Sequence, residues 1–357
     1  MTLPQSTVCR RIAAGVLVVC FLAADSPAQS SRDWQRFPAI VEAPMPAELF
    51  ALGDVHGDYD RTIELLAAAH LIASHPAAPR SVEWTGGASV LVCTGDMIDK
   101  YDHGMNVIAM MRVLEPLAAQ AGGRVIVTMG NHEAEFLAGA GADQKNAEFE
   151  HELDAAGIPP ADVAAGKDAM GIGRWLRDLP VGAKVGDWFF CHAGNTGRLS
   201  ISQLDERVQT QVTQHGFDSP ILTDPNSILE ARLHPRPWWD WDGQAPALKD
   251  ASTENQTHSS KNAGIDPGEN RLRAGIEALG AHHLVFGHQP GKVKFADGSE
   301  REAGVIYEKF DGLIFLIDTG MSRGVSSGRG ALLHISNASV HGASAVYADG
   351  TVQRLVQ

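Results

Sequence analysis

Glycine-flanked polar residues recur five times along this chain, each time directly after a short apolar run. Together they supply three aspartates, one asparagine and four histidines. The five motifs are Gly53-Asp54-Val55-His56-Gly57, Gly95-Asp96-Met97-Ile98-Asp99, Gly130-Asn131-His132-Glu133, Cys191-His192-Ala193-Gly194 and Gly287-His288. Oxygen and nitrogen donors of this kind suit Mn, Fe or Zn better than Ca or Cu(I). We therefore expect the set to hold two divalent or trivalent metal ions and to supply an acid.

Asp96 is the residue that we expect to bridge the two ions. It follows the middle one of three consecutive apolar runs, and a bridging group holds such ions roughly 3.5–4 Å apart. Asp54 and His56 alternate on one short loop, so both side chains point the same way and suit one ion. The neutral amide oxygen of Asn131 and the imidazoles of two later histidines suit the other ion. These later histidines are His192 and His288.

His132 directly follows a predicted ligand, so its ring is free to face the space above the metal ions. That place suits a general acid, and Asp99 is positioned to hold the imidazole and to raise its pKa. A hydroxide shared by the two metal ions would attack phosphorus in line, and His132 would protonate the leaving oxygen. For Glu133, a structural role is a better fit than a catalytic one.

The elements that must position these residues follow from hydrophobic periodicity. The pattern predicts strands over 49–52, 88–94 and 124–129 and helices over 59–72 and 105–121, a β-α-β-α-β run. Because open α/β sheets place their sites at the carboxyl ends of the strands, Asp54, Asp96 and Asn131 should converge.

The pattern is looser beyond residue 131. We expect an exposed helical insert over 139–168, a hairpin over 181–191, and a long loop or cap over the site at about 215–270. Four short apolar runs are interpreted as strands that complete a second sheet. They are 313–318, 330–335, 344–347 and 352–355. One domain over 47–357 accommodates all of these elements.

The N-terminus has the features of a signal peptide. Arg10 and Arg11 precede an apolar run over 12–24, which is too short to cross a bilayer comfortably. Small residues before Ala28 predict cleavage after it, so residues 1–28 would direct export to the periplasm or the exterior and 29–46 would be a linker. The alternatives are an uncleaved anchor and, less well matched, a lipid attachment at Cys20.

The composition of the chain limits the classes of partner that it is expected to bind. The chain has 357 residues with 29 Lys+Arg against 43 Asp+Glu, a formal net charge of −14. This balance argues against nucleic-acid binding and against stable attachment to anionic membranes, but metal ions can still attract phosphate locally. Cys93 and Cys191 lie inside apolar runs and are expected to be buried free thiols rather than a disulfide.

The ordered motifs resemble those of the calcineurin-like metallophosphoesterase superfamily, whose pattern is GDxHG, GDxxDRG, GNHE, a distal His and a late GH. The resemblance runs from Gly53 to His288. It implies an α/β fold, a β-sandwich of two mixed sheets flanked by helices in four layers, α-β-β-α. It also implies the ligand and acid roles given above.

The motif details resemble the phosphoprotein-phosphatase branch, and the Shewanella-like bacterial phosphatases in particular. This implies hydrolysis of phosphomonoesters, with a phosphorylated protein (Ser/Thr or Tyr) or a small phosphoester as substrate. Two alternatives stay open: hydrolysis of nucleotides or diadenosine polyphosphates, and a metal-binding protein that has lost catalysis.

One position departs from the family pattern. Lys100 stands where the family has an arginine, and Lys is a point charge whereas Arg grips two phosphate oxygens at once. A second phosphate-binding arginine of the branch lies between the two late histidines. Arg232 and Arg236 are the candidates here, and we assign Arg236 with Lys100 to substrate binding.

Overall fold

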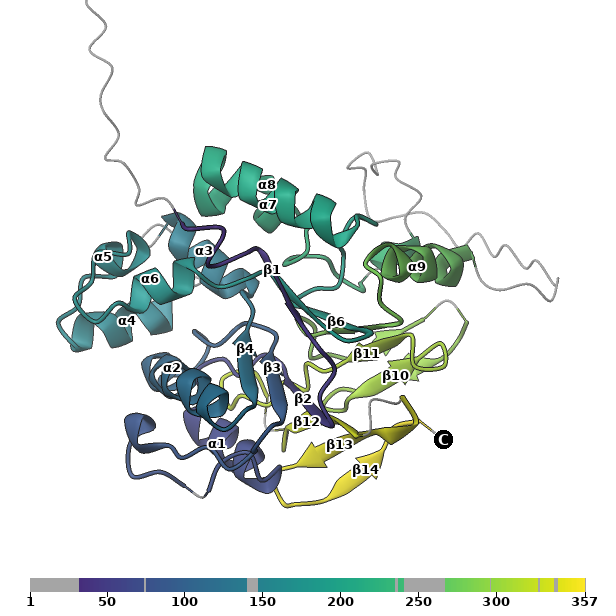
Figure 1. The fold of residues 1–357 in the computed structure, drawn as a ribbon, viewed down its shortest axis with the longest axis horizontal. Helices are drawn as coiled ribbons and strands as arrows, with labels where there is room; N and C mark the ends of the chain where they lie inside the picture. Colours follow the sequence, from purple (N-terminus) through teal and green to yellow (C-terminus); the bar gives the residue numbers. More distant parts are fainter. Residues whose placement is uncertain are drawn as a thin grey trace, which may run out of the picture. The chain divides into compact units, whose positions relative to one another are not determined.

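Two six-stranded sheets form the centre of the fold (Figure 1). The computed structural model describes residues 32–73, 75–139, 147–234, 237–240, 267–295, 297–326, 328–336 and 340–356. These ranges belong to one unit, Arg32–Gln357.

The first sheet has the order β14-β13-β12-β2-β3-β4. Its strands are β2 (Glu48–Leu52), β3 (Val90–Cys93), β4 (Arg124–Val127), β12 (Ala331–Ser336), β13 (Ala343–Tyr347) and β14 (Val352–Arg354). Strands β2, β3 and β4 are parallel, in the register Leu49↔Val90↔Arg124. Their carboxyl ends therefore meet at one edge, as the β-α-β-α-β prediction requires.

The second sheet has the order β1-β5-β6-β7-β11-β10. Its strands are β1 (Ile40–Ala43), β5 (Gly182–Val185), β6 (Trp188–Cys191), β7 (His283–Phe286), β10 (Tyr307–Lys309) and β11 (Ile314–Leu316). Strands β6, β7 and β11 are parallel, whereas β5 and β6 form the predicted hairpin around Gly186. A separate small hairpin pairs β8 (Val293–Lys294) with β9 (Glu300–Arg301).

Both faces of the central strands of each sheet are buried, which explains their continuous apolar runs. In β2, Leu49 and Ala51 belong to a cluster shared by the two sheets, whereas Phe50 and Leu52 belong to the cluster that contains the helices. This alternation follows from the two-residue period of a strand. The cluster between the sheets also contains Val92, Trp188, Phe190, Val285 and Phe315. The fold is thus a sandwich of two mixed sheets with flanking helices, as predicted.

Helices flank the sheets and connect the strands. They are α1 (Tyr59–Ala68), α2 (Gly104–Gln120), α3 (Asn131–Gly139), α4 (Ala147–Ala155), α5 (Pro160–Ala164), α6 (Ile172–Arg177), α7 (Ile201–His215), α8 (Pro220–Thr223) and α9 (Pro267–Ala278). Four 3₁₀ turns are also described: η1 (Pro79–Ser81), η3 (Gly216–Asp218), η4 (Trp238–Asp240) and η5 (Val340–Gly342). Helix α1 begins at its cap Asp58, which accepts a hydrogen bond from Arg61 N. Helix α2 contains Pro116 without ending there.

Three of the four late strands belong to a different sheet from the one that the sequence predicted. Only β11 joins the second sheet; β12, β13 and β14 extend the first one, because β12 pairs antiparallel with β2. The chain segments that pair are nearly the whole sequence apart, and local apolar patterning carries no information about such a partner.

Two further expectations need correction. The predicted linker at 29–46 contains β1, which pairs parallel with β5, and the Arg32 side chain donates to the carbonyls of Arg177 and Leu179. The insert at 139–168 is helical in its described part but is not merely exposed. Phe149 and Leu153 are completely buried, because α4 packs on the core through one apolar face.

Part of the predicted cap at 215–270 lies outside the described residues, as does the predicted signal segment at 1–28. No helix in the described part of the chain combines the length and the apolar composition that crossing a membrane requires. Cys93 and Cys191 are buried free thiols, as expected, and burial raises the pKa of each to about 12.

Candidate metal centre

The predicted ligands lie where parallel strands of both sheets end. Asp54, Asp96 and Asn131 follow β2, β3 and β4, whereas His192 and His288 follow β6 and β7. All five residues are buried. The two sheets therefore deliver their polar residues to one edge of the sandwich.

Several of these turns have unusual backbone conformations. Asp54, His56, Asp96 and His288 have φ angles of 37°, 41°, 52° and 68°. Residues other than glycine seldom adopt such angles, and when they do they cluster at functional sites. The adjacent glycines allow the loops after β3 and β4 to pass very close to each other, since a Cβ atom on Gly95 would lie 2.2 Å from Gly130 N.

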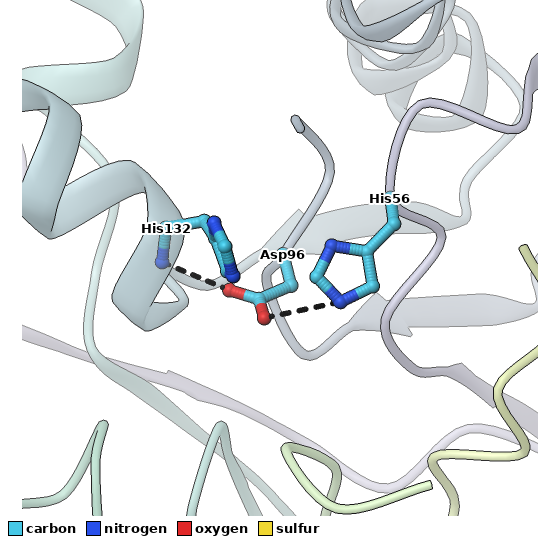
Figure 2. A group of neighbouring side chains, drawn as sticks. All are labelled: His56, Asp96 and His132. Carbon is cyan, nitrogen blue, oxygen red and sulfur yellow. Dashed lines mark hydrogen bonds and ion pairs between the residues drawn. The ribbon is translucent and has the colours of Figure 1, made fainter. Parts of the chain in front are cut away.

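One group of potential ligands consists of His56, Asp96 and His132 (Figure 2). Their donor atoms all lie within 4.8 Å of one another. His56 Nε2 is 3.5 Å from Asp96 Oδ2, and the backbone N–H of His132 donates to Asp96 Oδ1 over 3.1 Å. In Figure 2 the Asp96 carboxylate lies between the two histidines. The sequence prediction made His132 the acid, and the geometry also places its ring within reach of a metal ion.

The second group shares Asp96 with the first and adds His192 and His288. His192 Nε2 lies 3.4 Å from Asp96 Oδ2, 2.9 Å from Asn131 Oδ1 and 3.0 Å from His288 Nδ1. Asp96 Oδ2 therefore faces both groups, which is the arrangement that a bridging carboxylate needs.

The tautomers of two histidines leave lone pairs facing this space. His56 Nδ1 lies 3.2 Å from Ile98 O and His192 Nδ1 lies 2.9 Å from Thr94 O, so each Nδ1–H donates to a backbone carbonyl. Each Nε2 is then an acceptor. The lone pair of His192 Nε2 consequently faces a lone pair of the Asn131 amide oxygen, and the two repel each other. A cation bound between them would attract both.

Charges within the site favour metal binding. Burial lowers the pKa of His56 and, much further, that of His288, so both imidazoles stay neutral. Burial opposes ionisation of Asp96, but positive charge on the surrounding histidines, which they carry when protonated, outweighs it and lowers the pKa of Asp96. Neutral imidazoles around an ionised carboxylate are the protonation states that metal ligands require. The residues therefore fit two ions.

Asp54 was predicted to be a ligand of one ion, but neither ligand group includes it. It meets a carboxylate that sequence analysis missed. Its Oδ2 accepts a hydrogen bond from His288 N over 2.6 Å, whereas its buried Oδ1 has no hydrogen-bond partner. Burial, then the neighbouring Asp318 and Asp96, raise the pKa of Asp54 well above its usual range. Asp318 follows β11, and the run Leu316-Ile317-Asp318-Thr319-Gly320 carries the same strand-end signal as the five motifs.

His132 and Asp99 form a pair beside the first group. His132 Nδ1 lies 3.0 Å from Asp99 Oδ2, and the Asp99 side chain is fully buried. Burial opposes protonation of His132, but Asp96 and Asp99 prevail and raise its pKa to about 9. Without bound cations, the ring thus carries a proton at neutral pH. The structure brings together the two residues that sequence analysis assigned to proton transfer.

Glu133 has the structural role expected of it. Its carboxylate accepts backbone hydrogen bonds from Asp96, Met97 and Gly130 at 2.9, 2.7 and 2.8 Å, and one more from Ile98 at 3.3 Å. Burial and the nearby Asp96 raise the pKa of Glu133 to about 7, although the amides oppose the shift. Glu133 therefore fixes the loop that presents Asp96.

The structure describes two of the three basic residues that were considered for substrate binding. Lys100 is exposed, has a φ of 65°, and lies close enough to Asp99 to help lower its pKa, against the opposing effect of burial. Arg236 lies outside the described residues. Arg232 is exposed between two buried neighbours, and its charge is near enough to contribute, after burial, to the lowered pKa of His288.

The family follows from this geometry and from comparison with known proteins. The sequence profile described as calcineurin-like phosphoesterase matches residues 48–292, more than half of the chain. The chain belongs to the calcineurin-like phosphoesterase family, as its five motifs predicted. Members of this family use divalent metal ions, in agreement with the two ligand groups.

Two curated relatives match the chain locally. Shewanella-like protein phosphatase 2 of Arabidopsis thaliana is 35% identical over 88 residues, which are 25% of this chain and 21% of the relative. Shewanella-like protein phosphatase 1 of Plasmodium berghei is 32% identical over 92 residues, 26% of this chain and 24% of the relative. The chain thus aligns with less than a third of the length of these relatives.

A solved structure matches nearly the whole fold. It is the crystal structure of a cold-active protein-tyrosine phosphatase from a psychrophilic Shewanella species, with a TM-score of 0.60 and 19% identity. The match covers 89% of this chain and 83% of that one. At this identity the likeness concerns the fold, and it agrees with the two mixed sheets and flanking helices described above.

Proposed function

We propose that this chain is a metal-dependent phosphatase that hydrolyses phosphomonoesters with two metal ions. The observation that carries the proposal is the pair of ligand groups that share Asp96, with His132 and Asp99 beside them. Bound at these groups, two ions would neutralise phosphoryl oxygens and lower the pKa of a water nucleophile. His56 would serve one ion and Asn131, His192 and His288 the other, and Asp54 accepts a hydrogen bond from the backbone N–H of His288.

The proton-transfer step belongs to the chain's own residues. Asp99 holds Nδ1 of His132, so the other ring nitrogen is left to face a substrate. As a water oxygen bonds to phosphorus, the bond from phosphorus to the leaving oxygen breaks and His132 gives that oxygen a proton. Asp99 stabilises the imidazolium before the transfer and keeps the ring in one orientation afterwards.

The proposed substrate is a phosphorylated protein or a small phosphomonoester. The names of the relatives, which are protein phosphatases, support this class. Arg236, which lies outside the described residues, stays a candidate for gripping the phosphoryl group. Arg232 is a second candidate, supported by its charge, which contributes after burial and His192 to the lowered pKa of His288. Lys100 adds a second positive charge on the side of Asp99.

Turnover of p-nitrophenyl phosphate, with Mn²⁺ added and then removed by a chelator, tests the proposal. We expect activity that requires metal and two bound equivalents in the purified protein. Asp96→Asn should reduce turnover to near the background rate and weaken binding of both ions, because it removes the one charge that both groups share. Asp187→Asn, an exposed carboxylate at a hairpin turn, is the control. Chelator-resistant turnover, or a fully active Asp96→Asn variant, would refute the proposal.

We also propose that the protein is exported. The support is the positive residues Arg10 and Arg11 followed by the short apolar run and small residues before Ala28. N-terminal sequencing of the full chain expressed in a Gram-negative host should find a periplasmic product that starts at Gln29. A cytoplasmic product that retains residues 1–28 would contradict export.

A further inference from the structure

Helix α4, in the segment that sequence analysis treated as an exposed insert, contacts the elements that carry both members of the acid pair. Phe149 of α4 is completely buried and packs edge-on against Phe136 of α3, with ring centroids 4.9 Å apart. Helix α3 begins at Asn131 and carries His132 in its first turn. The position of α3, and with it the His132 backbone, is therefore supported by α4.

The same helix holds the loop that carries Asp99. The carboxylate of Glu152 accepts hydrogen bonds from Gly104 N at 2.7 Å and from Met105 N at 3.0 Å. These are first-turn amides of α2, where the partial positive charge of the helix also favours a carboxylate. A side chain at Gly104 would crowd these contacts, since a Cβ there would lie 3.2 Å from Glu152 Oε1 and 3.3 Å from Phe149.

A third contact reaches Asp99 itself. The Glu148 side chain lies close enough to the Asp99 carboxylate for that neighbour to raise the pKa of Glu148. Glu148, Phe149 and Glu152 all belong to one nine-residue helix, Ala147–Ala155.

We propose that α4 is the positioning element of the general acid, in which Glu152 and Phe149 set the separation between Asp99 and His132. The inference rests on the proposed phosphatase function. Glu152 is a positioning residue: it touches neither the ligand groups nor the reacting atoms, and it acts by fixing the Asp99–Gly104 loop. Its loss should impair protonation of the leaving group while metal binding continues.

The test compares two aryl esters that differ only in their leaving group. p-Nitrophenolate leaves readily without a proton, whereas phenolate from phenyl phosphate depends on the acid. In Glu152→Ala, we expect kcat/KM for phenyl phosphate to fall about tenfold or more, and that for p-nitrophenyl phosphate to fall less than about threefold. Asp154→Asn removes an exposed carboxylate from the same helix and should leave the ratio of the two values unchanged.

Two further measurements distinguish a misplaced acid from a loss of metal. Metal analysis of Glu152→Ala should find the wild-type content. In the full chain loaded with Zn²⁺, the ring-nitrogen NMR signals of His132, assigned by their absence in His132→Gln, should shift in Glu152→Ala and not in Asp154→Asn. If Glu152→Ala does not fold, Gly104→Ala, which pushes against the same contacts, is assessed by the same ratio and the same signals.

An equal loss on both esters, an unchanged ratio, or unmoved His132 signals would overturn the role of α4. Failure of the proposed function would look different, because the wild-type chain itself would then hydrolyse neither ester. In that case the NMR comparison still decides whether α4 positions His132.

Discussion

At the scale of single residues, the site depends on side chains that hold the backbone as much as on the ligands. Asp96 belongs to both ligand groups. Its backbone has a φ of 52°, and hydrogen bonds to a neighbouring side chain hold the loop around it in place. Glu133 supplies that fixation by accepting backbone hydrogen bonds from both sides of the loop. The motif Gly-Asn-His-Glu thus contains a predicted ligand, a proposed acid and a structural anchor at successive positions.

Replacing Glu133 should therefore lower the stability of the fold, although Glu133 belongs to neither ligand group. In Glu133→Gln, one carboxylate oxygen becomes an NH₂ group that faces backbone donors, so we expect the free energy of unfolding to fall by about 2–4 kcal/mol. Urea denaturation measures this change. The control is Glu83→Gln, an exposed site. A difference from that control of less than about 1 kcal/mol would contradict the anchoring role.

At the scale of elements, the arrangement depends on strands that end side by side. Sequence patterning predicted β2, β3 and β4 and their motifs, because each strand is short, apolar and followed by glycine. It did not predict that β12 pairs with β2, nor that β1 is a strand, because pairing partners are chosen by contacts distant in sequence. Asp318 was missed for a related reason: its role depends on β11 lying beside β7.

The crossing of the β3 and β4 ends gives a prediction at this scale. Gly95 has a φ of 92°, and a Cβ there would lie 2.2 Å from Gly130 N, whereas Gly122 has a φ of 83° and open space around it. Gly122→Ala should cost about 1–2 kcal/mol in the free energy of unfolding, the conformational penalty alone. Gly95→Ala should cost clearly more and reduce metal content. Equal losses in denaturation and metal analysis would show that the close approach is unimportant.

The edge strand β10 supplies a prediction about pH. Lys309 is buried over the rings of Phe295 and Phe310 and lies 2.5 Å from Asp297 Oδ2. Burial opposes the shift, but the bond to Lys309 lowers the pKa of Asp297 to about 2. A lowered folded-state pKa gives stability that is present above the ordinary value near 4 and is lost as pH falls towards 2.

Thermal unfolding between pH 5 and 2 would measure this contribution. Because Asp297 is about half exposed, we expect it to be at most about 1 kcal/mol. Wild-type and Asp297→Asn proteins should differ most at pH 5 and converge near pH 2. A gap between their unfolding midpoints that stays constant over this range would refute the assignment.

At the scale of the whole molecule, the site exists only because two sheets bring their strand ends together. Asp54, Asp96 and Asp318 are all buried within this junction, and burial with mutual repulsion raises the pKa of Asp54. Bound cations would relieve that repulsion. Metal ions should therefore stabilise the entire fold, since they would link the ends of β2, β3 and β4 to those of β6 and β7.

Removal of metal should consequently lower the thermal midpoint of the full chain, and added Mn²⁺ should restore it. At a free metal concentration 100 times the dissociation constant, each site contributes about 2.7 kcal/mol to stability. Calorimetry with and without chelator measures the effect. Asp96→Asn should respond much less, because the shared ligand is lost. A midpoint that is the same with and without chelator would mean that no ion couples the two sheets.

The sequence by itself determined which residues could do chemistry and in which order they occur. Glycine, aspartate and histidine after apolar runs are local signals, so the family, the strands β2 to β4 and the predicted ligands could be inferred from them. Only the tertiary structure decided that Asp318 meets Asp54, that the charge of Arg232 acts on His288, and that α4 packs against the elements that carry the acid pair. Each of these depends on a long-range contact, and such contacts are set by packing of whole layers rather than by neighbouring residues.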